Sequence, residues 1–287
     1  MTFAYIAYLI LIAFICYLER SNIKRNMLSF YDLTSYKSTS LVYAIIVADT
    51  TLLVVCATLL HNVPYSSIIT SFVCNASNVI FTYISIGNKF KHVLTKIHPI
   101  KGLVMLFICF STTTVIMGLL PFHDPQHLAN VHISKEQTIT EIIGFVFTGI
   151  GEESMKLTFI VGFLSLSPVF TKNRRSIPFV IASCILSSAA FGLMHMLAWG
   201  NIAALDIAIS SIITVSMIVL FKNIWIPMIA HFLYDSSESI AQYLNSPVQY
   251  HTMQVFMILT LLYFIYWYLN RGRNISQITQ SNLTNHS

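Results

Sequence analysis

Two adjacent carboxylates and one ammonium interrupt an apolar run that extends from Ile142 to Phe170. A charged side chain near the centre of a bilayer is costly unless it is paired or hydrated. On a helix, Lys156 stands four residues from Glu152 and three from Glu153, so it can neutralise either acid while the other stays free. Two acids with one base indicate a reactive carboxylate. The alternative is a self-compensated ion pair that only fixes helix packing.

Two later apolar segments carry the other polar groups that could take part in chemistry. One ends in Phe191-Gly192-Leu193-Met194-His195, and the other contains His231-Phe232-Leu233-Tyr234-Asp235. His231 and Asp235 lie four residues apart and therefore share one helix face. Peptide hydrolysis in a membrane needs a base for water, a group that stabilises the developing oxyanion, and a wet cavity. The glutamates, histidines and aspartate supply the side chains for these tasks.

The composition places these residues in a membrane protein. Of the 287 residues, 55% are hydrophobic and 9% are charged, against roughly 25% charged residues in soluble domains. The positions of the basic residues behind the net charge of +5 therefore indicate which connections face the cytoplasm. No nucleic-acid partner is expected. The five cysteines lie in apolar runs without CxxC spacing, so neither a disulfide framework nor a thiolate metal site is indicated.

Apolar stretches of spanning length predict an all-α, polytopic transmembrane bundle of about nine helices, with eight as the alternative count. They fall at residues 2–18, 41–60, 66–86, 102–120, 142–170, 177–199, 202–221, 224–244 and 250–269. We divide the chain into N-terminal helices with an outer loop (1–139), an intramembrane core (140–245), and a last helix with a polar tail (246–287). The tail from Asn274 is rich in Ser, Thr, Asn and Gln, which predicts disorder.

The basic residues gather in alternate connections, after the first, third, fifth, seventh and ninth helices. By the positive-inside rule these connections face the cytoplasm. We therefore expect a multi-pass cell-membrane protein with its N-terminus outside and its C-terminus in the cytoplasm. The longest outer connection carries His123, His127 and His132, whose spacing matches no compact metal site.

Glu152-Glu153, Phe191-x-x-x-His195 and His231-x-x-x-Asp235, in this order on successive helices, resemble the three motifs of the CPBP family of intramembrane proteases. That family includes CAAX-prenyl endopeptidases and bacteriocin-processing and immunity relatives. The resemblance implies that Glu152 and His195 activate water, and that His231 and Asp235 steady the oxyanion.

The chain departs from the family pattern at two positions. The family usually has an arginine five residues after the first glutamate, where this chain has Leu157, and Lys156 stands one residue earlier. The third motif often ends in asparagine, where this chain has Asp235. We expect Glu152, Glu153, His195, His231 and Asp235 to be catalytic, with Lys156 and Phe191 in support.

Other functions use the same residue types. His195, His231 and Asp235 also resemble a zinc triad with an open position for water, but no HExxH-type spacing is present, so we expect no metal and no cofactor. An ion-coupled transporter carries intramembrane charges as well, but it usually has paired halves with interrupted helices. A non-catalytic scaffold or immunity protein is the third alternative. The expected partners are the lipid bilayer and a peptide or membrane-protein substrate.

The depths that the sequence predicts for Glu152 and His195 do not match. At 1.5 Å per residue, Glu152 lies about 15 Å from the outer end of its helix, and His195 about 7 Å from the break at Gly200-Asn201. If all helices end at one level, His195 is some 8–10 Å too shallow to meet Glu152. Asp206, near the outer end of the seventh helix, is expected to reach the interface.

Overall fold

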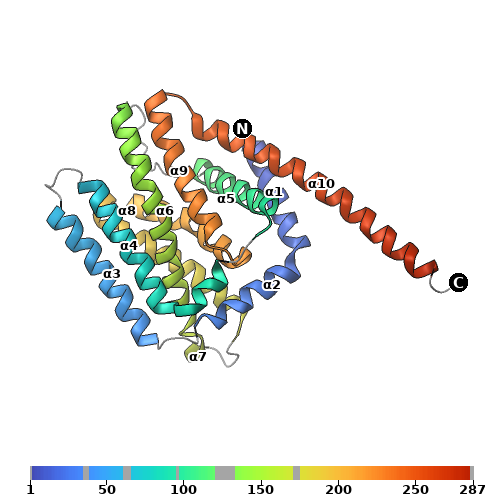
Figure 1. The fold of residues 1–287 in the computed structure, drawn as a ribbon, viewed down its shortest axis with the longest axis horizontal. Helices are drawn as coiled ribbons and strands as arrows, with labels where there is room; N and C mark the ends of the chain where they lie inside the picture. Colours follow the sequence, from blue (N-terminus) through green and yellow to red (C-terminus); the bar gives the residue numbers. More distant parts are fainter. Residues whose placement is uncertain are drawn as a thin grey trace.

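The computed structural model describes residues 2–34, 39–60, 66–94, 97–119, 133–170 and 175–284. Apart from one isolated bridge between Leu94 and Asn223, every regular element in these ranges is helical (Figure 1). The elements are α1 (Thr2–Leu18), α2 (Arg20–Ser29), η1 (Phe30–Asp32), α3 (Thr39–Leu60), α4 (Ser66–Ile86), η2 (Gly87–Val93), α5 (Pro99–Leu119), α6 (Lys135–Leu164), α7 (Ser167–Phe170), α8 (Ile177–Phe221), α9 (Trp225–Leu244) and α10 (Val248–Thr284). The predicted all-α bundle is confirmed.

Six helices in the described ranges are long and apolar enough to cross a membrane, and a bent pair adds a seventh. The bent pair is α1 and α2, which meet at 75°. The remaining two predicted spans are helical as well, as α3 and α9. The apolar part of α3 is short, from Val42 to Cys56, and α9 carries several polar side chains. The structure is that of a multi-pass membrane protein.

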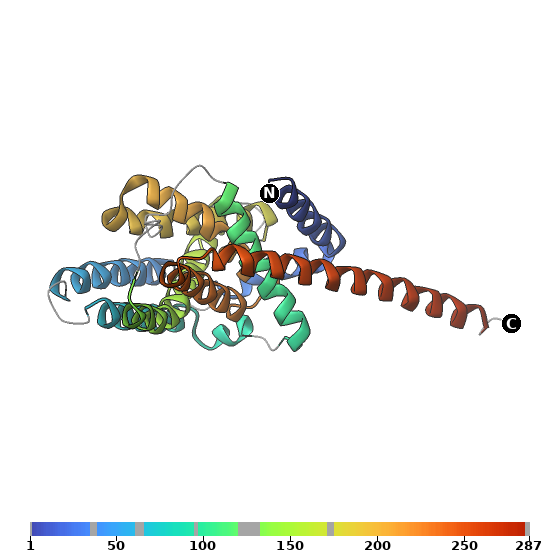
Figure 2. The ribbon, with the colours of Figure 1, turned by 90° about the horizontal axis from the view of Figure 1, so that it is seen from above.

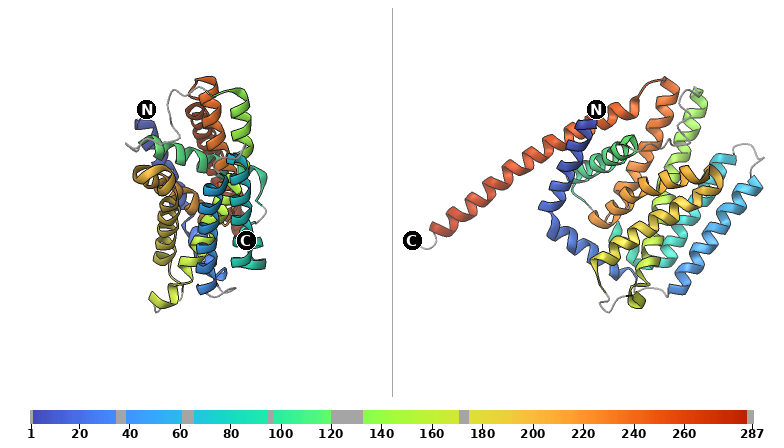
Figure 3. Two further views of the ribbon diagram at one scale, coloured as in Figure 1. Left: turned by 90° about the vertical axis from the view of Figure 1, so that its left-hand side faces the viewer. Right: turned by 180° about the vertical axis from the view of Figure 1, so that it is seen from behind.

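Helix α8 contains two predicted spans joined by a sharp turn. Its limbs, Ile177–Met196 and Gly200–Phe221, meet at Gly200, whose φ of 84° lies in a region that only glycine adopts without strain. The Ser211 hydroxyl donates to the Ser188 carbonyl at 3.5 Å, so the second limb folds back along the first. Figure 3 shows this hairpin beside α6.

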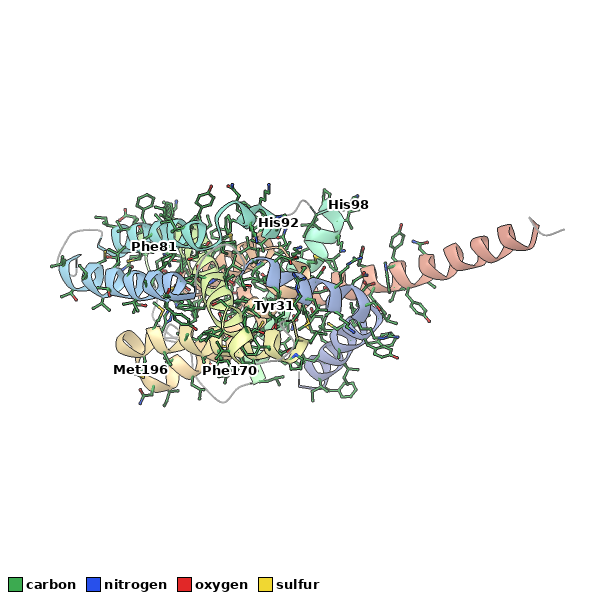
Figure 4. The ribbon with its side chains drawn as sticks, turned by 90° about the horizontal axis from the view of Figure 1, so that it is seen from below. Tyr31, Phe81, His92, His98, Phe170 and Met196 are labelled. Atoms are coloured by element: carbon green, nitrogen blue, oxygen red, sulfur yellow. The ribbon has the colours of Figure 1, made fainter. Side chains whose placement is uncertain are left out.

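Four connections between helices are bonded to one another, which places them at one end of the bundle. We call this end, formed by residues 20–34, 87–94, 175–176 and 222–224, the basic end. The bonds are Asn26 Nδ2 to Leu220 O (2.7 Å), Tyr31 Oη to Ser176 O (2.9 Å), Arg175 Nη2 to Asp32 Oδ1 (2.6 Å) and Ile224 N to Val93 O (2.8 Å). Figure 4 looks onto this end and labels Tyr31 and His92. Four of the five connections predicted to share one side of the membrane therefore lie together.

Helix α6 occupies the middle of the bundle and packs against α4, α8 and α9. It begins at a capping box, in which Ser134 and Gln137 bond each other's backbone N–H groups. Its second half buries Leu157, Ile160 and Leu164 in a cluster shared with α2 and α8. Beside this cluster, Thr82 of α4 donates to the Ser154 carbonyl at 2.8 Å. Polar contacts of this kind join neighbouring helices in the absence of water.

Helix α10 differs from the prediction at its C-terminal end. The polar tail from Asn274 was expected to be disordered, whereas the helix continues to Thr284. It projects beyond the bundle (Figures 1 and 2). Extending an existing helix costs far less free energy than nucleating a new one. The apolar part of α10 therefore favours helical structure in the polar tail that follows it.

Candidate active site

A cavity of about 410 Å³ lies between α5, α6, α8 and α9. Six of the seven residues singled out from the sequence line it, namely Glu152, Lys156, Phe191, His195, His231 and Asp235. The seventh, Glu153, is fully buried behind the side chains that line the cavity. The three helical segments that carry the motifs are therefore brought together around one space.

Two glycines allow α6 to approach its neighbours closely just before the acid pair. A Cβ atom at Gly149 would lie 2.8 Å from the Met228 carbonyl oxygen of α9. One at Gly151 would lie 2.4 Å from the Cα atom of Asn75 in α4. Both contacts are with backbone, which cannot move aside without separating the helices. The close packing holds Glu152 against the first turns of α9, where His231 lies.

The acid pair divides into a buried ion pair and a carboxylate that faces the cavity. Lys156 Nζ lies 2.6 Å from Glu153 Oε1, and the Glu153 side chain has no exposed area. The ammonium also donates to Thr214 Oγ1 at 3.3 Å and lies 4.2 Å from the centre of the Phe191 ring. The Glu152 side chain is 20% exposed. Of the two pairings that the spacing allowed, Lys156 adopts the one with Glu153.

His231 connects the acids through both of its nitrogens. Nδ1 lies 2.9 Å from Glu153 Oε1, and since a carboxylate only accepts, Nδ1 is the donor. Nε2 lies 3.6 Å from Glu152 Oε2 and 3.4 Å from Asp235 Oδ2. Nε2 therefore faces the cavity, between one carboxylate of α6 and one of its own helix.

His195 approaches Glu152 from α8. Its Nε2 lies 3.8 Å from Glu152 Oε1, too far for a direct hydrogen bond but suited to a bridging water. Its Nδ1 lies 2.9 Å from the Phe191 carbonyl oxygen, and a carbonyl only accepts, so Nδ1 carries a proton. In the neutral ring Nε2 is then an acceptor. The Phe191-x-x-x-His195 spacing thus sets both the direction and the tautomer of the imidazole.

The predicted mismatch in depth between His195 and Glu152 is wrong. It assumed that all helices end at one level. Helix α6 begins at Lys135, and its 30 residues span about 45 Å, more than the ~30 Å of a bilayer core. In Figure 3, α6 and α9 extend beyond the turn of the α8 hairpin. The short distance from His195 to Gly200 reflects a short limb of α8.

Among the cavity residues that were not recognised from the sequence are three with polar side chains, Asp206, Thr214 and Tyr234. Asp206 is 1% exposed and lines the cavity, so the expectation that it reaches the interface is wrong. Thr214 and Tyr234 line it as well. The hairpin places Asp206 beside the first limb of α8, and only its charge in an apolar run signalled this role. Thr214 and Tyr234 had no such signal. His123, His127 and His132 lie outside the described residues.

The sequence left a zinc triad of His195, His231 and Asp235 as an alternative. In the described ranges, no group of three or more His, Cys, Asp and Glu side chains is placed to hold a metal ion. Nδ1 of each histidine is bonded to a protein oxygen, and each Nε2 faces Glu152. The expectation that the site works without a metal stays a prediction.

Fold and site together define a multi-pass helical membrane protein with a cluster of acids and histidines around an internal cavity. Residues 135–237 match the Rce1-like family, described as type II CAAX prenyl endopeptidase Rce1-like. This segment contains every predicted site residue, and the match confirms the resemblance to the CAAX-protease families. Comparison with curated proteins and comparison with solved structures found no match. The family implies a protease that acts on a peptide or protein in a membrane.

Proposed function

We propose that the protein is an intramembrane endopeptidase in which Glu152 activates the attacking water. The observation that carries the proposal is the position of the Glu152 carboxylate. It faces the cavity between His195 Nε2 at 3.8 Å and His231 Nε2 at 3.6 Å. A base within reach of one water molecule is the geometry required for general-base catalysis.

The water would be held by two acceptors. Glu152 Oε1 and the unprotonated Nε2 of His195 both face the gap between them, and a water there donates one hydrogen to each. Its lone pair is then free to attack the carbonyl carbon of the scissile bond. Lys156 does not compete for Glu152, because its ammonium is bonded to Glu153. Glu152 therefore takes the proton as the carbon–oxygen bond forms.

His231 and Asp235 would stabilise the oxyanion. Nδ1 of His231 donates to Glu153, so Nε2 also carries a proton when the ring is an imidazolium, the form that the carboxylates of Glu152, Glu153 and Asp235 around it favour. That Nε2 proton points into the cavity and donates a hydrogen bond to the developing negative charge. Asp235, 3.4 Å from Nε2, keeps this proton in place before substrate binds. Glu152 then returns its proton to the leaving amide nitrogen as the carbon–nitrogen bond breaks. The step requires only water and the peptide, and no metal or cofactor enters it.

We further propose that the basic end faces the cytoplasm, with the N-terminus outside. The bonded connections there carry Arg20, Lys24, Arg25, Lys89, Lys91, Arg175 and Lys222. Lys135 begins α6, and it is the other end of that helix, at Leu164, that packs against Phe30 of the basic end. An excess of Lys and Arg in short connections marks the cytoplasmic side.

The test compares wild type with Glu152→Gln and with Glu136→Gln, a matched control that removes an exposed glutamate from the first turn of α6. Each protein is reconstituted into vesicles with a library of transmembrane peptides, and products are identified by mass spectrometry. We expect Glu152→Gln to lower the cleavage rate about 10²–10⁴-fold, with Glu136→Gln unchanged. A Glu152→Gln protein that is folded and cleaves at the wild-type rate would contradict the proposal.

The scaffold and transporter alternatives predict a different result in cells. A scaffold keeps its cellular function in a Glu152→Ala strain that is matched for expression, whereas a protease loses it. A transporter shows substrate-dependent ion flux in the same vesicles without any new peptide termini. Peptide products that disappear in Glu152→Gln distinguish the protease from both.

A further inference from the structure

A second cavity, of about 470 Å³, lies at the opposite side of α5 from the candidate active site, among α1, α2, α5, α8 and α10. We propose that this cavity is a binding site for one anionic phospholipid of the leaflet at the basic end. Ligand pockets of proteins typically enclose about 300–1,000 Å³, so the space is large enough for part of an acyl chain. The proposal does not depend on the proposed protease activity.

The shape of the cavity follows from the bend between α1 and α2. The two helices meet at 75°, so the apolar α1 runs along the bundle while the polar α2 turns across its basic end. Asn26 of α2 donates to the Leu220 carbonyl of α8 at 2.7 Å, which holds α2 in this position. The inner corner of the bend therefore lies where headgroups give way to acyl chains.

The walls of the cavity change from apolar to charged along its length. Ile12, Met105, Met217 and Phe264, from four helices, contribute apolar surface. Arg25 of α2 and Lys101, in the first turn of α5, are exposed and line the part nearest the basic end. An amphipathic ligand with a negative headgroup matches this distribution of charge. Basic pockets between transmembrane helices bind anionic lipid headgroups in this way.

One acid also lines the cavity, but it is engaged within the chain. Asn22 Nδ2 donates to Glu19 Oε2 at 2.6 Å, and Arg25 Nη2 donates to Asn22 Oδ1 at 3.1 Å. These two hydrogen bonds orient the Arg25 side chain along α2. The guanidinium has five N–H donors, so others remain for a ligand. Two cations against one acid leave a net positive charge for a phosphate.

Trp267 gives the site a direct probe, because it lines the cavity beside Phe264 at a ring separation of 5.8 Å. The other tryptophans are Trp199 and Trp225; replacing both by Phe leaves Trp267 as the reporter. Delipidated protein in neutral detergent is titrated with phosphatidylglycerol or phosphatidylcholine that carries brominated acyl chains. Quenching of Trp267 then reports occupancy of the cavity.

We expect brominated phosphatidylglycerol to quench Trp267 at a mole fraction at least tenfold lower than brominated phosphatidylcholine. Each cation contributes about a fivefold gain in affinity for an anionic headgroup, so Arg25→Gln/Lys101→Gln should weaken phosphatidylglycerol binding about thirty-fold. The matched control is Lys24→Gln/Lys91→Gln, which removes two exposed cations of the basic end that do not line the cavity.

A cavity-filling variant, Val104→Phe, tests where the acyl chain lies. It should abolish the phosphatidylglycerol-specific quenching while the protein keeps its thermal unfolding midpoint. Equal quenching of the Trp267 reporter by the two lipids would overturn the proposal, and this measurement needs no change in the cavity. Unchanged phosphatidylglycerol affinity in Arg25→Gln/Lys101→Gln would overturn it as well.

Discussion

Nδ1 of His231 lies 2.9 Å from Oε1 of Glu153, across the interface between α9 and α6. The same oxygen receives the ammonium of Lys156 at 2.6 Å. Glu153 is thus the common partner of a lysine and a histidine, and its side chain is fully buried. This arrangement assigns the two adjacent acids different tasks, since Glu153 holds other side chains in place while Glu152 faces the cavity.

Removing one charge of the buried pair should destabilise the protein more than removing both. Lys156→Met leaves Glu153 buried without its cation, and breaking such a pair from one side costs about 3–5 kcal/mol. Glu153→Gln/Lys156→Met removes both charges and should recover more than half of that loss. Thermal unfolding of the two single variants and the double variant measures the coupling. Additive effects would show that the two side chains do not interact as a pair.

Asp235→Asn should keep much of the activity. The amide retains the shape of the side chain, and its oxygen can accept the proton on His231 Nε2 from the position of Oδ2 at 3.4 Å. In the same assay, incubation with a chelator should leave the wild-type rate unchanged. Peptide cleavage before and after chelation provides the measurement. Activity that is lost on chelation and restored by zinc alone, together with an inactive Asp235→Asn, would make the histidines metal ligands.

Gly149→Val should lower both stability and activity, because the new side chain meets the backbone of α9 at the Met228 carbonyl. Overpacking of this kind costs about 1–3 kcal/mol and moves His231 away from Glu152. Gly144→Ala is the matched control on the same helix, because a Cβ atom there has nothing within 4 Å. It should stabilise the protein by about 0.5–1 kcal/mol. Unfolding temperatures and cleavage rates are compared, and a Gly149→Val protein that behaves like Gly144→Ala would contradict the packing argument.

The orientation in the membrane can be tested by labelling single cysteines. In a background without the five native cysteines, Lys91→Cys and Arg175→Cys should be protected from a membrane-impermeant reagent in intact cells, and Lys135→Cys should react. The physical reason is the excess of cations at the basic end. Labelling of Arg175→Cys and Lys135→Cys from the same side would contradict the proposed orientation.

The sequence predicted most of the ionisable residues at and behind the cavity wall, because charge is rare in an apolar chain. Each of Glu152, Glu153, His195, His231 and Asp235 stands in an apolar helix, where an ionisable side chain needs a partner or water. Helical periodicity also limited Lys156 to two partners. The choice between them depends on Thr214 and Phe191, which arrive from α8, and no local pattern contains that information.

The features that escaped prediction depend on how helices cross. Asp206 is buried because the α8 hairpin places it against the first limb of that helix. The prediction counted residues from the outer end of the helix and therefore expected Asp206 at the membrane–water interface. The depth of His195 was misjudged because helix lengths were measured from a common plane. The tilt of a helix, and how far it extends beyond its neighbours, are set by packing between helices. A hydropathy profile carries no information about that packing.

The i, i+3 spacing of Glu153 and Lys156 has a consequence for biogenesis. Helix α6 leaves the ribosome before α8 and α9, so it must enter the lipid phase before Thr214 and His231 exist. A helix that carries its own counterion exposes one uncompensated charge, that of Glu152, to the translocon rather than three. The pair that later anchors His231 therefore first allows the segment to be inserted.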